Sequence, residues 1–164
     1  MKGSKIFAGV LGLCGIVSLP AVLGKEPGGD IAYPAGYREW VHVKTTIVGP
    51  QNPMLQRYAG IHHIYANKTA MDGYGAGRFA DGSVLVFDLL ETRDNAGITT
   101  EGPRRFIDVM KRDSRLYPAT GGWGFEEFSG DGQTGTLTAE ARADCYNCHA
   151  TQKGRDFVFS SFRK

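Results

Sequence analysis

The alternation of apolar and polar residues beyond position 36 predicts a chain built mainly from short strands. Apolar side chains recur at every second position between Trp40 and Val48, which is the period of a half-buried strand. The clearest strand, Ser83 to Leu90, follows the turn signal Asp81-Gly82. Further strands are expected at Ile61 to Ala66, Arg105 to Met110 and Trp123 to Phe128. We therefore predict a mainly β (α+β) fold, an antiparallel β-sheet domain with a few short helices.

Two short helices are expected between these strands. One begins at Asn67-Lys68-Thr69 and ends in the glycines of the segment Asp72 to Gly77. The other covers Thr138 to Arg142, with Thr138 as its N-cap. The chain has 23 glycines among 164 residues, which is about twice the average share and favours turns over long helices.

The first 24 residues resemble an export signal. Lys2 and Lys5 precede an apolar stretch from Ile6 to Val17 that is too short to span a bilayer, and Val22-Leu23-Gly24 is typical of a cleavage site. We expect residues 1–24 to be a signal peptide, residues 25–36 a flexible lead-in, and residues 37–164 one domain. The mature protein is then expected to be periplasmic.

Removal of this signal makes the chain formally neutral. The full sequence has 19 basic and 17 acidic residues, and the signal contains two lysines and no acid, which leaves 17 of each. No basic block with interleaved aromatic residues is present, so we expect no nucleic-acid partner. No second apolar run is long enough for a membrane span.

The candidate chemistry lies near the C-terminus, in Cys145-Tyr146-Asn147-Cys148-His149. Two thiols at this spacing can add to the vinyl groups of a haem, and the adjoining histidine can ligate its iron. A structural zinc site would need four ligands, and the third cysteine, Cys14, lies in the expected signal. A redox CxxC pair would need a βαβ context, and it does not require the adjoining histidine. The motif therefore predicts one covalent haem c, with His149 as iron ligand.

The late position of this motif bears on the second axial position of the iron. No methionine follows His149, and Met54, Met71 and Met110 are most simply core residues. The pattern favours five-coordinate iron with an open face. Five-coordinate cytochromes c′ are four-helix bundles, which the glycine-rich strand pattern excludes.

The order of several short segments resembles the cytochrome P-460 family, which includes the cytochromes c′-β. These segments are Gly36 to Val41, Phe79 to Val86, Gly122 to Phe125 and the terminal CxxCH. The resemblance covers about Tyr37 to Phe162. It implies a mostly antiparallel β fold, one c-type haem with a histidine ligand, and commonly a homodimer.

Phe87 separates the two branches of that family. The resemblance implies that hydroxylamine-oxidising cytochromes P-460 have a lysine here, cross-linked to the porphyrin, and phenylalanine has no nitrogen with which to form that bond. An aromatic residue resembles the c′-β branch, in which apolar groups cap the iron. Tyr58 aligns with a second capping aromatic. Such a pocket favours NO and CO, because dioxygen depends more on hydrogen-bond donors.

We therefore expect a protein that binds NO or CO and scavenges, buffers or senses NO, rather than an enzyme, with a redox partner protein as a further candidate. The alternatives are a haem enzyme that oxidises hydroxylamine or NO or acts on peroxide, and an electron carrier with a methionine or histidine as sixth ligand.

Other polar residues have less specific interpretations. His62 and His63 adjoin a predicted strand, so their side chains face opposite sides and cannot hold one metal; at most one can approach the haem, and surface or core roles are simpler. Asp144 and Glu140 are candidate proton acceptors or ordinary helix charges. Candidate cations for the haem propionates are Arg38, Arg78 and Lys153.

Overall fold

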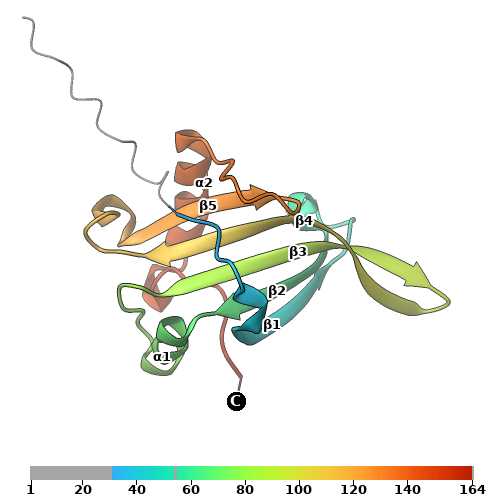
Figure 1. Cartoon of the computed structure of the whole chain (residues 1–164), viewed down its shortest axis with the longest axis horizontal. Coiled ribbons are helices and arrows are strands. Elements are labelled where there is room, and N and C mark those ends of the chain that lie inside the picture. Colours follow the sequence, from blue (N-terminus) through green and yellow to red (C-terminus); the bar gives the residue numbers. More distant parts are fainter. Residues whose placement is uncertain (1–30, 54, 164) are drawn as a thin grey trace, which may run out of the picture.

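The computed structural model describes residues 31–53 and 55–163, and the expected signal at 1–24 lies outside them. Five antiparallel strands form one sheet in the order β1-β2-β3-β4-β5, so each strand pairs with its neighbours in sequence (Figure 1). The strands are β1 (Val41–Val48), β2 (Gly60–Ala66), β3 (Val84–Asn95), β4 (Ile98–Arg112) and β5 (Trp123–Ser129). The helices are α1 (Lys68–Ala76), α2 (Ala139–Ala150) and the 3-10 turns η1 (Tyr37–Glu39), η2 (Gln56–Tyr58), η3 (Pro118–Thr120) and η4 (Lys153–Arg155). The predicted mainly β class is confirmed.

The edge strand β1 departs from the simple alternation predicted for it. Its pairing with β2 shifts between His42 and Lys44, where the strand has a bulge. Val43 is buried, whereas Ile47 is 61% exposed. The bulge therefore changes which side chains face the core.

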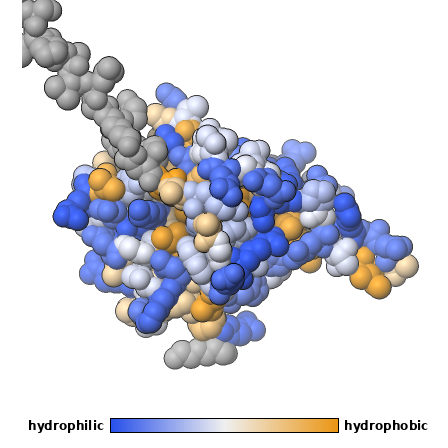
Figure 2. All heavy atoms as spheres, viewed as in Figure 1, coloured by the Kyte–Doolittle hydropathy of each residue, from blue (hydrophilic) through white to orange (hydrophobic). Residues whose placement is uncertain are grey.

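The β3–β4 hairpin is much longer than predicted and extends beyond the rest of the sheet (Figure 1). Its turn residues Ala96 and Gly97 have φ angles of 49° and 82°, as a two-residue turn with left-handed backbone requires. Residues 91–101 are all exposed, so no apolar alternation marks these strand extensions in the sequence. Figure 2 shows a mostly hydrophilic surface with apolar side chains at the hairpin tip, where Ile98 is 65% exposed.

Each face of the sheet is covered by its own apolar cluster. One face packs against α1, α2 and the C-terminal segment, through residues that include Leu85, Met110, Trp123 and Phe125. The opposite face packs through Val86, Ile107, Val109 and Phe128, with Tyr37 from η1. Ile31 is buried in this second cluster, so the last residues of the expected lead-in pack against the sheet.

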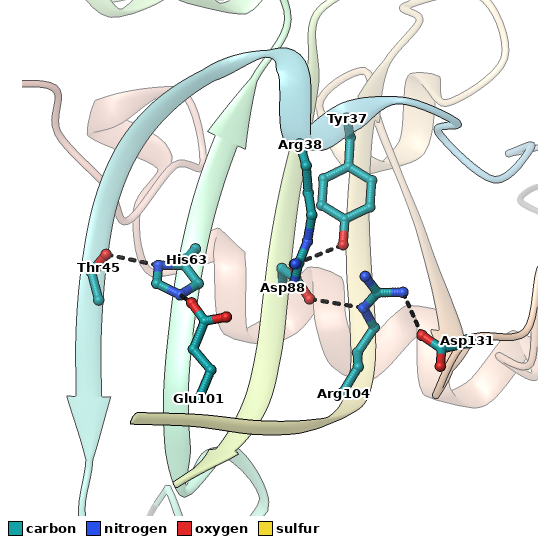
Figure 3. A network of polar contacts seen from close by, with 8 residues as sticks. All are labelled: Tyr37, Arg38, Thr45, His63, Asp88, Glu101, Arg104 and Asp131. Atoms are coloured by element: carbon teal, nitrogen blue, oxygen red, sulfur yellow. Dashed lines mark hydrogen bonds and ion pairs between the residues drawn. The ribbon is translucent and has the colours of Figure 1, made fainter. Parts of the chain in front are cut away.

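A buried carboxylate holds the second face together. Asp88 is fully buried and accepts hydrogen bonds from the Tyr37 hydroxyl (2.7 Å), Arg38 Nη2 (2.7 Å) and Arg104 Nε (3.1 Å) (Figure 3). Arg104 also pairs with the exposed Asp131 at 2.8 Å. Arg38 is therefore engaged by Asp88 on the face turned away from α2, which makes it a weaker candidate than Arg78 and Lys153 for pairing with a haem propionate.

Both main helices have a side-chain N-cap, and the predicted cap at Thr138 is confirmed. The Asn67 side chain accepts a hydrogen bond from Ala70 N at 2.9 Å, and Thr138 Oγ1 accepts one from Ala141 N at 3.2 Å. Helix α1 ends at Ala76 with Gly77 as its C-cap, within the glycine segment where its end was predicted, and the φ of 72° at Gly77 suits a left-handed C-cap. Within the described ranges, no helix is long and apolar enough to cross a membrane.

Candidate functional site

Helix α2 carries the whole CxxCH motif. Its first turns are held to β5 by an ion pair between Arg142 and the buried Glu126, with 2.5 Å between Nη2 and Oε2. Cys145 and Cys148 lie three residues apart, on neighbouring turns of one helix face, and both are free thiols. Burial raises the pKa of the Cys145 thiol to about 11, and nearby acidic side chains add to the shift. This thiol is therefore protonated at neutral pH.

His149 is oriented by a backbone hydrogen bond. Its Nδ1 lies 2.8 Å from the carbonyl oxygen of Phe157, and a carbonyl can only accept, so Nδ1 carries the proton. The ring also contacts Phe125 and Phe159, at centroid distances of 5.2 and 5.0 Å. This arrangement leaves Nε2 as the ring nitrogen with a free lone pair, as a metal-ligating histidine requires.

The turn that presents the Phe157 carbonyl is itself supported by Asp156. The carboxylate of Asp156 accepts hydrogen bonds from Phe79 N at 2.7 Å and Arg112 Nη1 at 2.9 Å. Its backbone carbonyl accepts a third from Trp123 Nε1 at 3.0 Å. Asp156 and Phe157 both have positive φ, at 53° and 67°, so these bonds hold an otherwise unfavourable backbone conformation. No local motif in the sequence identifies this support.

Phe87 lies on the face of β3 that turns toward α2. It pairs with Ile64 on β2 and Asp108 on β4. The ring of Tyr58, from η2, meets it edge-on with 5.6 Å between the ring centroids, and Phe106 stacks at 6.4 Å. The structure thus brings together Tyr58 and Phe87, the two aromatic residues selected from the sequence, which are 29 positions apart.

This aromatic group lies close to the motif helix. Burial raises the pKa of Tyr58, and the nearby Asp108 and Cys145 raise it further. Cys145 also packs against the same apolar cluster as Ile64. Tyr58, Phe87 and Cys145 therefore border one region between the sheet and α2.

Two acidic residues that sequence reasoning did not select line this region. Asp108 and Glu127 lie opposite each other on β4 and β5. Burial raises the pKa of Asp108 well above its usual range, and its hydrogen bond to Glu127 and the charge of Glu127 raise it further. Arg57 pairs with Glu127 and partly offsets this effect. The sequence signal for Asp108 and Glu127 is an acidic residue at an inward-facing position of an otherwise apolar strand.

His62, which sequence reasoning assigned to a surface or core role, lies beside Phe87. Its ring stacks on Phe87 with 4.4 Å between centroids and 28° between planes. His63 faces the other side, where its ring nitrogens bond to Thr45 at 2.8 Å and Glu101 at 2.7 Å (Figure 3). The prediction that the two side chains face opposite sides is confirmed.

The remaining candidates from the sequence lie at the surface or in the core. Glu140 and Asp144 are exposed on α2, and Arg78 and Lys153 are exposed in loops or turns. Met110 belongs to the buried cluster and Met71 packs against it, whereas Met54 lies outside the described residues. Exposure on α2 favours the reading of Glu140 and Asp144 as ordinary helix charges.

The residues present fit a haem. Two unpaired thiols share one helix face, and the next residue is a histidine whose Nδ1 is already bonded. No residue of α2 is buried by the protein, and the aromatic ring of Phe159 beside His149 is 48% exposed. A flat apolar ring attached at Cys145 and Cys148 would cover these groups. The fold and this set of groups together define a β-sheet haem protein.

Comparison with known families agrees with this class. The family model described as Cytochrome P460 matches residues 34–160, which is most of the chain. The chain therefore belongs to the cytochrome P460 family and is a haem-binding cytochrome. None of the curated proteins compared with it matched.

Proposed function

We propose that this cytochrome carries one haem c bound through Cys145 and Cys148, with five-coordinate iron held by His149, and that it binds NO or CO. It acts in the periplasm after removal of the export signal, and it stores, scavenges or senses NO instead of converting a substrate. When bound, the haem supplies the iron at which these gases coordinate. We also propose that the chain forms a homodimer and has a redox partner protein.

The observation that carries the proposal is the contrast between the two sides of the site. On the α2 side, one imidazole is fixed by the Phe157 carbonyl so that Nε2 is free to ligate. On the sheet side, the rings of Phe87, Tyr58 and Phe106 pack on one another. The phenyl rings of Phe87 and Phe106 supply no iron ligand, which favours an open coordination position.

The aromatic side also supports selectivity for NO and CO. Rings that pack against each other exclude water and donate few hydrogen bonds, which weakens dioxygen binding more than CO or NO binding. The same rings crowd the open position. We expect ligand entry to require side-chain movement and therefore to be slow.

A second candidate is an enzyme of the hydroxylamine-oxidising kind. It is favoured by Asp108 and Glu127, because an acid with a raised pKa near a reacting group can exchange protons at neutral pH. Phe87 argues against it, since the carbon side chain cannot form the cross-link that the family resemblance implies for those enzymes.

One absorption spectrum of the purified ferrous protein tests the proposal. A high-spin Soret band of five-coordinate haem, shifted by added CO, is the expected result. A strongly red-shifted Soret band would indicate a cross-linked porphyrin and favour the enzyme. Sharp low-spin α and β bands would show a sixth protein ligand and overturn the open-site assignment.

A further inference from the structure

We propose that His62 is the hydrogen-bond donor of the gas-binding pocket, and that its Nε2–H contacts a diatomic ligand held beside Phe87. This inference rests on the proposed function, because it assigns a role at the same site. It adds a nitrogen donor to the aromatic cap, and such a donor would also strengthen dioxygen binding and so reduce the selectivity for NO and CO.

The sheet register places His62 beside Phe87. Ile64 lies directly opposite Phe87, and His62 lies two residues earlier on the same face of β2. Diagonal neighbours across two strands are within reach of aromatic side chains. The ring stacks on Phe87 at 4.4 Å between centroids, so the wall that faces the haem region includes an imidazole.

The hydrogen-bonding state of this ring points to a ligand. Nδ1 of His62 is buried and has no partner within residues 31–53 and 55–163. Nε2 is not among the buried unpartnered atoms, and no bond to it is found in the same ranges, so it remains accessible. Buried polar side chains are normally bonded, and this ring can form a bond only through Nε2.

The neighbouring histidine shows that this state is specific to one face. Both ring nitrogens of His63 are engaged, by Thr45 at 2.8 Å and Glu101 at 2.7 Å. His63 therefore has a complete set of partners within the protein. Within the part of the chain that the structure describes, His62 has no hydrogen-bond partner.

Burial also determines the protonation state of the His62 ring. It lowers the pKa of His62 to about 4, and the charges of His63 and Lys44 lower it further. The imidazole is therefore neutral near pH 7 and has one N–H. Because a buried N–H without an acceptor is costly, we place this proton on Nε2, where a ligand can accept it.

A donor at this position would favour ligands that accept negative charge from the iron. The neutral imidazole should hold NO more strongly than an all-carbon wall does, by about fivefold, which is the effect of one neutral hydrogen bond. CO should respond through its stretching frequency, because a nearby donor weakens its C–O bond.

The test compares the holoprotein with two variants, His62→Phe and His63→Phe. The first keeps an aromatic ring on Phe87 but removes both nitrogens, and the second makes the same chemical change on the opposite face. We expect infrared spectra of the ferrous CO form to show a higher C–O frequency in His62→Phe only, and NO to dissociate about fivefold faster from that variant. If His62→Phe does not fold, His62→Leu serves as the second nitrogen-free variant.

The outcomes separate this inference from the proposed function. If the wild type is five-coordinate and binds CO, and the CO frequency is the same with and without the His62 nitrogens, the donor role is wrong while the gas-binding proposal stands. If the wild type is six-coordinate and His62→Phe makes it five-coordinate, His62 is an iron ligand and both proposals are overturned. A wild type that is five-coordinate and binds no CO also overturns both.

Discussion

The Nδ1 atom of His149 lies 2.8 Å from the backbone carbonyl oxygen of Phe157, eight residues further along the chain. A side-chain substitution cannot remove a backbone acceptor. The orientation of the imidazole therefore depends on the residues that hold the Phe157 turn, and Asp156 is the main one.

Asp156→Ala is expected to destabilise the protein and loosen the histidine. The change removes the acceptor for Phe79 N and the partner of Arg112, which should cost about 2 to 4 kcal/mol of unfolding free energy. Denaturant unfolding measures the loss, and resonance Raman spectroscopy of the ferrous holoprotein measures the strength of the iron–histidine bond.

Asp156→Asn is the matched control, because its amide retains one acceptor oxygen. We expect a smaller loss of stability and an iron–histidine frequency close to that of the wild type. A wild-type frequency in Asp156→Ala would show that Asp156 does not position His149.

Phe87→Ala is expected to speed ligand binding. The ring is packed between His62 and Tyr58, and its removal opens the space in which a gas must move. CO association measured after flash photolysis should become faster. Phe87→Leu keeps most of the bulk and should change the rate less, and equal rates in all three proteins would exclude a capping role for Phe87.

Much of the fold could be predicted because local patterns determine it. Thr138 caps its helix as predicted, and the other helix begins where Asn67-Lys68-Thr69 predicted it, with the Asn67 side chain as its cap. The inner strand β3 is a nearly continuous apolar run from Val84 to Leu90, because a different apolar cluster covers each face of the sheet. The hairpin beyond Leu90 has no buried face, so its length could not be read from periodicity.

Local sequence alone could predict only the CxxCH part of the site, whereas Tyr58 and Phe87 were selected through the family resemblance. The CxxCH motif lies on one helix, and the structure presents it there. The stacking of His62 on Phe87 depends on strand register, and the support of His149 depends on a turn with two positive φ angles. Neither feature has a sequence signal, because both arise from residues brought together by tertiary packing.

Asp88→Asn is expected to lower stability without a change in the haem spectrum. The carboxylate is fully buried and bonds to Tyr37, Arg38 and Arg104, so a neutral amide leaves Arg38 without its counter-charge and leaves Arg104 only the exposed Asp131. We expect a loss of about 3 to 5 kcal/mol by denaturant unfolding. The absorption spectrum should not change, because the network lies on the face of the sheet turned away from α2 (Figure 3).

Asp131→Asn is the control for that prediction. Its side chain is 90% exposed although it pairs with the same Arg104. An exposed pair contributes about 0 to 1 kcal/mol, so little change is expected. A loss in Asp131→Asn equal to that in Asp88→Asn would show that burial of Asp88 is not what makes its network stabilising.

Asp108→Asn is expected to flatten the dependence of stability on pH. Burial and Glu127 raise the pKa of Asp108 in the folded protein above its unfolded value of about 3.9. Between these two pKa values the folded state binds the proton that the unfolded state has lost, so stability falls as pH rises above about 4. Asparagine has no such proton, so the variant should gain stability relative to the wild type as the pH rises above about 4.

Denaturant unfolding at several pH values measures this slope. Glu127→Gln retains Asp108 and removes the neighbouring charge, so its slope should lie between those of the wild type and Asp108→Asn. Identical slopes in all three proteins would mean that Asp108 is ionised in the folded state throughout this range. It would then be too well solvated to exchange protons near neutral pH, and the enzymatic alternative would lose the observation that favours it.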